Sequence, residues 1–174
     1  MNKKILFVDD ESHILEGMRR NLRKYFEVET ALGAQAGLEA IANNDTFAVI
    51  VSDMRMPGMD GVDFLKRARE LSPDSVRMML TGNADQETAV RAVNDGDVFR
   101  FLNKPCEPEV LAKVLNLGVQ QHQLLNAEKE LLNKTLRGSI EALAEILALV
   151  KPLAFGRIKM IRTRCNELDL HMGV

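Results

Sequence analysis

The sequence contains one segment whose pattern identifies the architecture: Phe47-Ala48-Val49-Ile50-Val51-Ser52-Asp53-Met54-Arg55-Met56-Pro57-Gly58-Met59-Asp60-Gly61. Its first half is a short apolar run rich in β-branched residues, which predicts a strand buried on both faces. The run ends at Asp53, and the proline and glycines that follow predict a loop. Ligands bind at the carboxyl ends of strands in open α/β sheets. Asp53 is therefore either a cap for the loop or the next helix, or a reactive carboxylate.

Strand-like and helix-like patterns alternate on both sides of this segment. The patterns predict strands at 4–8, 28–31, 47–53, 76–80 and 98–102 and helices at 12–25, 33–43, 62–71 and 84–93. Ser12 is the expected N-cap of the first helix. Strands separated by helices of this length form right-handed βαβ crossovers and a parallel sheet. We therefore expect an α/β fold, a flavodoxin-like (βα)5 doubly wound parallel sheet.

A long helical extension is expected after Pro105. Glu107-Pro108-Glu109 is typical of a helix start, no other proline occurs before Val150, and Gly138-Ser139 is the expected place for a kink or a restart. Leucines recur every seven residues with polar residues between them, and a stronger apolar stripe follows: Leu117, Leu124 and Leu131, then Ile140, Leu143, Ile146, Leu147 and Val150. This weak heptad seam predicts that two chains are able to pair here.

Composition excludes several classes of protein. The 174 residues carry a formal net charge of −2, so no global basic field indicates a nucleic-acid partner. No apolar run is long enough for a membrane span or a signal peptide. Cys106 and Cys165 lack metal-ligand spacing, which predicts a reduced, cytoplasmic protein. The three histidines have no partners at ligand spacing and are expected to be solvated: His13, His122 and His171.

Polar residues stand at the ends of four predicted strands: Asp9 and Asp10, then Asp53, Thr81 and Lys104. The strand order of this fold brings these ends to one edge of the sheet. Three carboxylates repel one another unless a cation lies among them, and oxygen ligands favour Mg²⁺. A metal, an ammonium and a hydroxyl around one carboxylate are suited to phosphoryl transfer onto that carboxylate. The alternative for Asp9 and Asp10 is that they only cap a helix.

In these motifs the chain resembles the receiver domain of bacterial two-component response regulators. The resemblance covers residues 1 to about 120 and includes every motif in order. The motifs are Val8-Asp9-Asp10-Glu11, Asp53 with Met56-Pro57-Gly58-Met59-Asp60-Gly61, Thr81-Gly82, and Lys104-Pro105. The resemblance implies that Asp53 accepts a phosphoryl group from a sensor histidine kinase. Such a protein is a phospho-acceptor that catalyses its own phosphotransfer, and we expect no other enzymatic activity.

The resemblance also implies roles for the neighbouring residues. Asp10, Asp53 and the backbone carbonyl of Arg55 would ligate Mg²⁺, with Asp9 acting through water. Thr81 and Lys104 would engage the phosphoryl group, and the Lys104–Pro105 peptide bond would be cis.

Phe101 matches the aromatic switch of the family. Movement of Thr81 toward the phosphoryl group would leave room for Phe101 to turn inward and would change the surface made by helix 4, strand 5 and helix 5. The alternative is that Phe101 is an ordinary core residue, because its strand is apolar.

The resemblance divides the chain into a receiver domain at 1–120, a helical signalling linker at 121–137, and a helical segment at 138–174 that begins an output domain. Residues 136–160 are similar to the entry helices of HD-type output domains, such as the HD-GYP cyclic-di-GMP phosphodiesterases. A Gly-His step followed by Arg-Val starts the metal site there, whereas Gly156 is followed here by Arg157. The output is therefore either truncated or degenerate. The basic residues between 151 and 164 form either a nucleic-acid-binding helix or, as we expect, a solvated face.

Two hypotheses from different classes follow. In the first, phosphorylation of Asp53 controls a receiver that relays its switch through helix 5 and the linker to an output domain, with a homodimer formed through that helix. In the second, the chain is a constitutive helical-dimer adaptor that keeps the fold without using its chemistry. A truncated cyclic-di-GMP phosphodiesterase regulator is a third reading, and its activity would need residues beyond 174.

Overall fold

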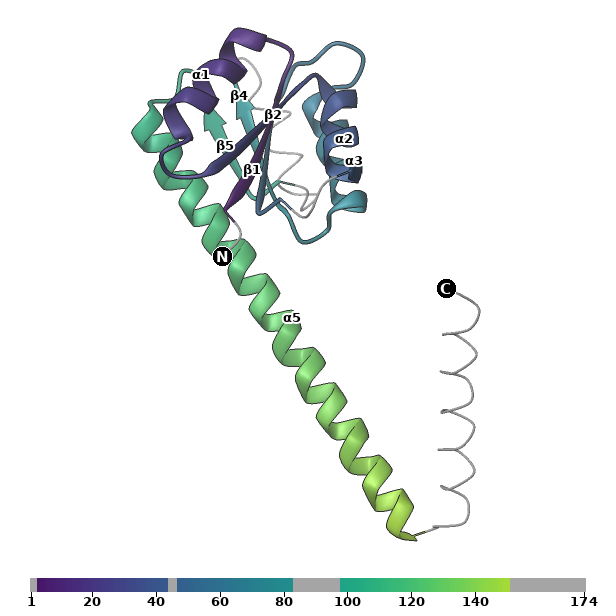
Figure 1. The fold of residues 1–174 in the computed structure, drawn as a ribbon. Coiled ribbons are helices and arrows are strands. Elements are labelled where there is room, and N and C mark those ends of the chain that lie inside the picture. The colour runs from purple at the N-terminus through teal and green to yellow at the C-terminus, as the bar shows by residue number, and fades with distance from the viewer. Residues whose placement is uncertain (1–2, 44–46, 83–97, 151–174) are drawn as a thin grey trace. The chain divides into compact units, whose positions relative to one another are not determined.

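The computed structural model describes residues 3–43, 47–82 and 98–150. Five parallel strands form one sheet in the order β2-β1-β3-β4-β5 (Figure 1). Their bounds are β1 Lys4–Asp9, β2 Glu27–Leu32, β3 Val49–Asp53, β4 Val76–Thr81 and β5 Arg100–Asn103. The expected flavodoxin-like sheet is confirmed, and β3, every residue of which is buried, lies at its centre.

Helices cover both faces of the sheet. The helices are α1 Ser12–Leu22, α2 Ala34–Asn43, α3 Gly61–Leu71 and α5 Pro108–Val150. Figure 1 shows α2 and α3 together on one face, with α1 and the first turns of α5 on the other. The helix expected at 84–93 lies outside the described residues.

The period of two along each strand divides the core into two apolar layers. In β1, Ile5 and Phe7 pack in the layer beneath α1 and α5, whereas Leu6 and Val8 pack in the layer beneath α2 and α3. Gly118 lets α5 approach the sheet closely, because a Cβ there would overlap with the Met78 side chain. Burial on both faces is why the inner strands β1, β3 and β4 are mostly apolar, whereas the edge strands β2 and β5 are more exposed and more polar.

The start of α1 differs from the prediction. Ser12 is the first helical residue and not the N-cap, which is Glu11 and makes no side-chain capping bond. The carboxylate of Asp9 instead accepts a 2.9 Å hydrogen bond from the Glu11 N–H. The loop that follows β1 is therefore ordered by the acid at the strand end.

The helix α5 continues through Gly138 and Ser139, so the restart expected there is wrong. A glycine inside a helix costs about 1 kcal/mol relative to alanine, which a helix of 43 residues tolerates. The hydroxyls of Thr135 and Ser139 each donate to the carbonyl oxygen four residues earlier, at 2.9 Å. The amphipathic piece expected at 157–168 lies outside the described residues.

The chain divides into two compact units, Met1–Ala127 and Glu128–Val174. Within the part of the chain that the structure describes, no helix combines the length and the hydropathy needed to cross a membrane.

Candidate functional site

Four side chains with reactive or charged groups stand at the carboxyl edge of the sheet. Asp9, Asp53 and Thr81 are the last residues of β1, β3 and β4, and Lys104 directly follows β5. The register places Asp53 beside Leu80 and Thr81 beside Asn103, so neighbouring strands end at the same level. Parallel strands thus bring residues from four distant parts of the sequence to one edge.

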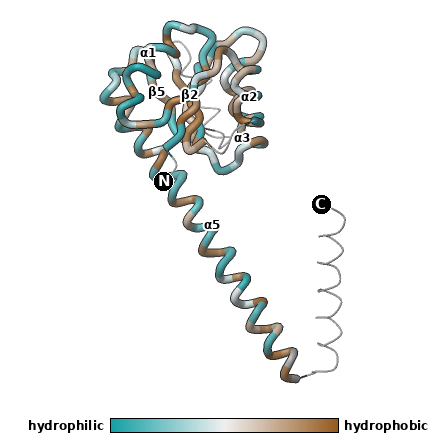
Figure 2. Tube along the Cα trace, in the orientation of Figure 1, coloured by the Kyte–Doolittle hydropathy of each residue, from teal (hydrophilic) through white to brown (hydrophobic). Residues whose placement is uncertain are grey.

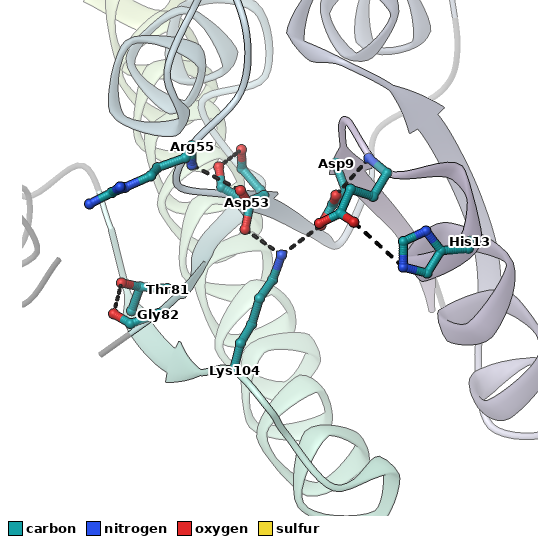
Figure 3. Close-up of polar contacts among 9 residues, drawn as sticks. Asp9, His13, Asp53, Arg55, Thr81, Gly82 and Lys104 are labelled. Atoms are coloured by element: carbon teal, nitrogen blue, oxygen red, sulfur yellow. Dashed lines mark hydrogen bonds and ion pairs between the residues drawn. The ribbon is translucent and has the colours of Figure 1, made fainter. Parts of the chain in front are cut away.

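The ammonium group of Lys104 lies between two carboxylates (Figure 3). Its Nζ lies 2.8 Å from Asp9 Oδ2 and also pairs with Asp53 Oδ1. The side chains of Asp9 and Asp53 are only 3% and 12% exposed. Two carboxylates with so little access to water need a nearby cation, and here Lys104 provides it.

Backbone N–H groups complete the environment of both acids. Asp53 Oδ2 accepts a 2.9 Å bond from the Arg55 N–H, and Asp9 Oδ1 accepts one from the Glu11 N–H. The cap of α3 is Asp60, whose side chain accepts from the Asp63 N–H at 2.8 Å. Asp53 is therefore not the N-cap of that helix, which leaves its carboxylate directed at the lysine.

The environment of Lys104 raises its pKa. Burial on its own would lower the pKa of the ammonium, but the hydrogen bonds that it donates to Asp53 and Asp9, together with the negative charges of these two residues, outweigh burial and hold the pKa above its ordinary value. Lys104 is thus a fixed positive charge beside Asp53 at neutral pH.

The side chain of Asp10 is exposed to solvent, whereas Asp9 and Asp53 are buried. Among the described residues no three acidic, histidine or cysteine side chains converge as a ready metal site. The donors themselves fit a hard cation, because Asp9, Asp10, Asp53 and a backbone carbonyl offer only oxygen. Two of these carboxylates already converge on one cation, the Lys104 ammonium.

In the sheet, Asp9 on β1 lies to one side of Asp53 on β3. Thr81 on β4 and Phe101 on β5 lie to the other side. Thr81 is buried, and its hydroxyl donates a 3.0 Å bond to the Gly82 carbonyl (Figure 3). Phe101 is half-buried against the layer beneath α2 and α3. The Thr81 hydroxyl is therefore hydrogen-bonded within the loop that follows β4.

The loops around the site have constrained backbones. The Lys104–Pro105 peptide bond is cis, and the Lys104 N–H donates to the Thr81 carbonyl at 2.8 Å. Gly61 lies against Asp53: a Cβ there would overlap with the Asp53 carbonyl oxygen, and its N–H donates to the Met54 carbonyl at 2.8 Å. Only a glycine lets α3 begin this close to the end of β3.

Two histidines have partners that their sequence spacing does not reveal. His13 is exposed and lies 3.5 Å from Glu11 at the margin of the site. His122 is buried, so the expectation that it is solvated is wrong. Its Nδ1 donates to the Asp74 carbonyl at 2.8 Å, and its Nε2 accepts from the Asn126 amide at 2.9 Å. The only hint in the sequence is that His122 follows the buried Leu115 and Val119 at helical spacing.

Comparison with known families identifies the same domain. The family model described as response regulator receiver domain matches residues 5–116. This range contains all of the strand-end residues considered above, from Asp9 to Lys104.

Individual relatives extend the comparison. The chain is 33% identical over 169 residues to the hydrogenase transcriptional regulatory protein HoxA of Cupriavidus necator, covering 95% of this chain and 34% of HoxA. It is similar to a crystal structure of adenylate cyclase from Rhodopirellula baltica, with 47% identity, a TM-score of 0.76, and coverage of 77% of this chain and 99% of that one. A receiver domain structure from Clostridium thermocellum is 33% identical, with a TM-score of 0.66 and coverage of 70% and 98%. The chain thus spans about a third of the length of its curated relative HoxA.

Proposed function

Because the chain belongs to the response regulator receiver domain family, we propose that Asp53 accepts a phosphoryl group from a sensor histidine kinase. One observation carries this proposal: the Asp53 carboxylate ends the central strand and is held between the Lys104 ammonium and the Arg55 N–H. A carboxylate oriented in this way presents an oxygen to an incoming phosphorus. The chain is then a signalling phospho-acceptor of the cytoplasm, and it has no other catalytic task.

The transfer forms one bond and breaks one bond. An Asp53 carboxylate oxygen attacks phosphorus, and the bond to the donor breaks, leaving an acyl phosphate and releasing the imidazole of a phosphohistidine or, from acetyl phosphate, acetate. The Lys104 ammonium offsets the added negative charge. The Thr81 hydroxyl reaches the new phosphoryl oxygen once it leaves the Gly82 carbonyl.

The residues proposed to hold Mg²⁺ are Asp10, Asp53 and the backbone carbonyl of Arg55, with Asp9 acting through water. When bound, the ion neutralises phosphoryl oxygens and orients the donor. The ammonium of Lys104 and this ion would share the same two buried carboxylates, Asp9 and Asp53. Lys104 and a bound ion would therefore both neutralise these two carboxylates.

We further propose that the signal leaves through α5. Inward movement of Thr81 would let the half-buried Phe101 turn inward and alter the surface that includes β5 and α5. The chain would act as a receiver at 1–120, a linker at 121–137 and the start of an output domain at 138–174, and two chains would pair through the helix. The names of similar proteins include a transcriptional regulator and an adenylate cyclase, so no particular output, HD-type or other, is favoured over the rest.

The test is the intact mass of the full chain after incubation with Mg²⁺ and acetyl phosphate. We expect one acid-stable, base-labile phosphoryl adduct on the wild type, and none on Asp53→Asn or in the presence of a chelator. A matched Asp63→Asn variant, which alters an exposed acid of α3, should keep the adduct.

A folded chain that gains no adduct would contradict the proposal and favour the adaptor hypothesis. Cleavage of cyclic di-GMP by this chain would contradict the view that it has no hydrolase site.

A further inference from the structure

A cavity lies between the amino edge of the sheet and α5, whereas Asp53 lies at the carboxyl edge. It has a volume of about 430 Å³ and is bounded by the segments that lead into β1 and β2. Figure 1 shows the start of β1 beside α5. The residues that give the cavity its chemistry are Lys3 before β1, Tyr25 and Phe26 before β2, and Glu109, Lys113 and Asn116 on α5. Small-molecule sites in proteins have this size and combine apolar walls with a few polar groups.

One face of α5 forms the long wall of this cavity. Glu109, Lys113 and Asn116 are spaced by four and three residues, so they lie in one row along the helix. At a rise of about 1.5 Å per residue, the first and last are about 10 Å apart along the helix axis. Figure 2 shows hydrophilic and hydrophobic positions alternating along α5, and the hydrophobic Leu111 and Leu115 are buried in the core. The wall therefore has a carboxylate at one end, an amide at the other, and an ammonium between them.

Two aromatic residues form the apolar part of the cavity. Phe26 is buried, whereas Tyr25 is 46% exposed. Two contacts orient the Tyr25 ring: its centroid lies 6.3 Å from that of Phe26, and Lys24 Nζ lies 4.6 Å from it. An exposed ring in a fixed orientation is a surface on which a planar group is able to stack.

Lys3 and Lys113 make the cavity attractive to an anion. Both residues are exposed, and among the residues that the structure describes neither forms an ion pair. The lining contains these two ammonium groups and one carboxylate, that of Glu109. A phosphate monoester carries a charge of about −1.5 to −2 at neutral pH, which two ammonium groups match.

We propose that this cavity binds a guanine nucleotide with a single phosphate. Lys3 and Lys113 would pair with the phosphate, the Asn116 amide would donate to a phosphate or ribose oxygen, and the base would stack on Tyr25. This site is distinct from the phospho-acceptor site, because it lies away from the edge of the sheet that holds Asp53. A bound nucleotide would join the starts of β1 and β2 to the helix through which we propose that the signal leaves.

Glu109 selects the base. A carboxylate accepts two hydrogen bonds side by side, and guanine presents two neighbouring donors, N1–H and N2–H, on one edge. Adenine presents one amino group beside an acceptor nitrogen, so it would place a lone pair against a carboxylate oxygen. Because Glu109 lies at the far end of the row from Asn116, the base and the phosphate have separate places in the cavity.

Isothermal titration calorimetry of the full 174-residue chain tests the proposal, with no Mg²⁺ and no phosphodonor present. We expect saturable binding of guanosine 5′-monophosphate (GMP) with a Kd below about 1 mM. Ribose 5-phosphate lacks the ring, and adenosine 5′-monophosphate (AMP) lacks the paired donors. Both should therefore bind at least about tenfold more weakly than GMP.

Variants of exposed residues locate the site. Lys113→Met removes one of the two ammonium groups and should raise the Kd for GMP about tenfold. The matched control Lys66→Met removes an exposed lysine of α3 and should leave the Kd unchanged. Glu109→Gln should reduce the preference for GMP over AMP to less than about twofold.

Three results would overturn the proposal. The first is a Kd for GMP above about 1 mM. The second is an equal Kd for wild type and Lys113→Met, which would place the nucleotide elsewhere. The third is an affinity for AMP or ribose 5-phosphate equal to that for GMP, which would contradict recognition of the base. Because the titrations contain no phosphodonor, their result is independent of whether Asp53 accepts a phosphoryl group.

Discussion

Lys104 Nζ lies 2.8 Å from Asp9 Oδ2, although 95 positions separate the two residues in the chain. Asp9 ends β1 and Lys104 follows the edge strand β5, so the ammonium reaches across the end of β3 and contacts Asp53 on the way. One cation therefore serves two buried acids. This relationship explains how two buried carboxylates are stable close to one another.

Replacement of Lys104 should destabilise the domain, because the two buried carboxylates depend on its positive charge. Lys104→Met leaves Asp9 and Asp53 without their cation, and we expect the free energy of unfolding in urea, with chelator, to fall by about 1–3 kcal/mol. The double variant Lys104→Met/Asp53→Asn should recover most of the loss, because one of the two like charges is gone. Equal stability of wild type and Lys104→Met would show that the acids do not need the ammonium.

The same pair predicts an alkaline limit. The pKa of Lys104 is higher in the folded chain than the ordinary lysine value of about 10.4. Its contribution to stability is therefore complete below that ordinary value and disappears as the pH rises through the raised folded pKa. The difference in unfolding free energy between wild type and Lys104→Met should stay constant from pH 8 to about 10 and then shrink. If the difference in unfolding free energy between wild type and Lys104→Met grew as the pH rose, the raised pKa of Lys104 would be contradicted.

Gly61 should be intolerant of a side chain, unlike another glycine of the same domain. A Cβ at Gly61 overlaps with the Asp53 backbone carbonyl, so Gly61→Ala should lower the unfolding free energy by about 2–4 kcal/mol and slow phosphorylation from acetyl phosphate. At Gly17 in α1 nothing lies within 4 Å of the added methyl group. Gly17→Ala should thus be neutral or stabilising by up to about 1 kcal/mol. Similar losses at both positions would mean that the close approach at Gly61 is unimportant.

The buried His122 should contribute to the stability of the receiver. Its ring joins α5 to the Asp74 carbonyl in the turn before β4, and truncation leaves that carbonyl and the Asn126 amide without this partner. We expect His122→Ala to cost about 1–3 kcal/mol in urea unfolding. The control His13→Ala removes an exposed ring and should change stability by less than about 0.5 kcal/mol. A His122→Ala chain as stable as the control would falsify this role.

The fold was predictable from local patterns. Alternation of strand-like and helix-like segments implied parallel βαβ units, and parallel strands end at one edge of their sheet. That rule was enough to expect Asp9, Asp53, Thr81 and Lys104 in one region, which is where the structure places them. The family resemblance then added the roles of these residues, which remain proposals.

Contacts between distant segments were not predictable in this way. No local pattern shows that Lys104 contacts Asp9 as well as Asp53, or that the Thr81 hydroxyl donates to Gly82. The burial of His122 and the overlap that excludes a side chain at Gly61 likewise depend on which segment packs against each residue. Backbone periodicity is a property of neighbouring residues and can be read along the chain, whereas hydrogen-bond partners and burial are set by packing between elements, which exists only after the chain has folded.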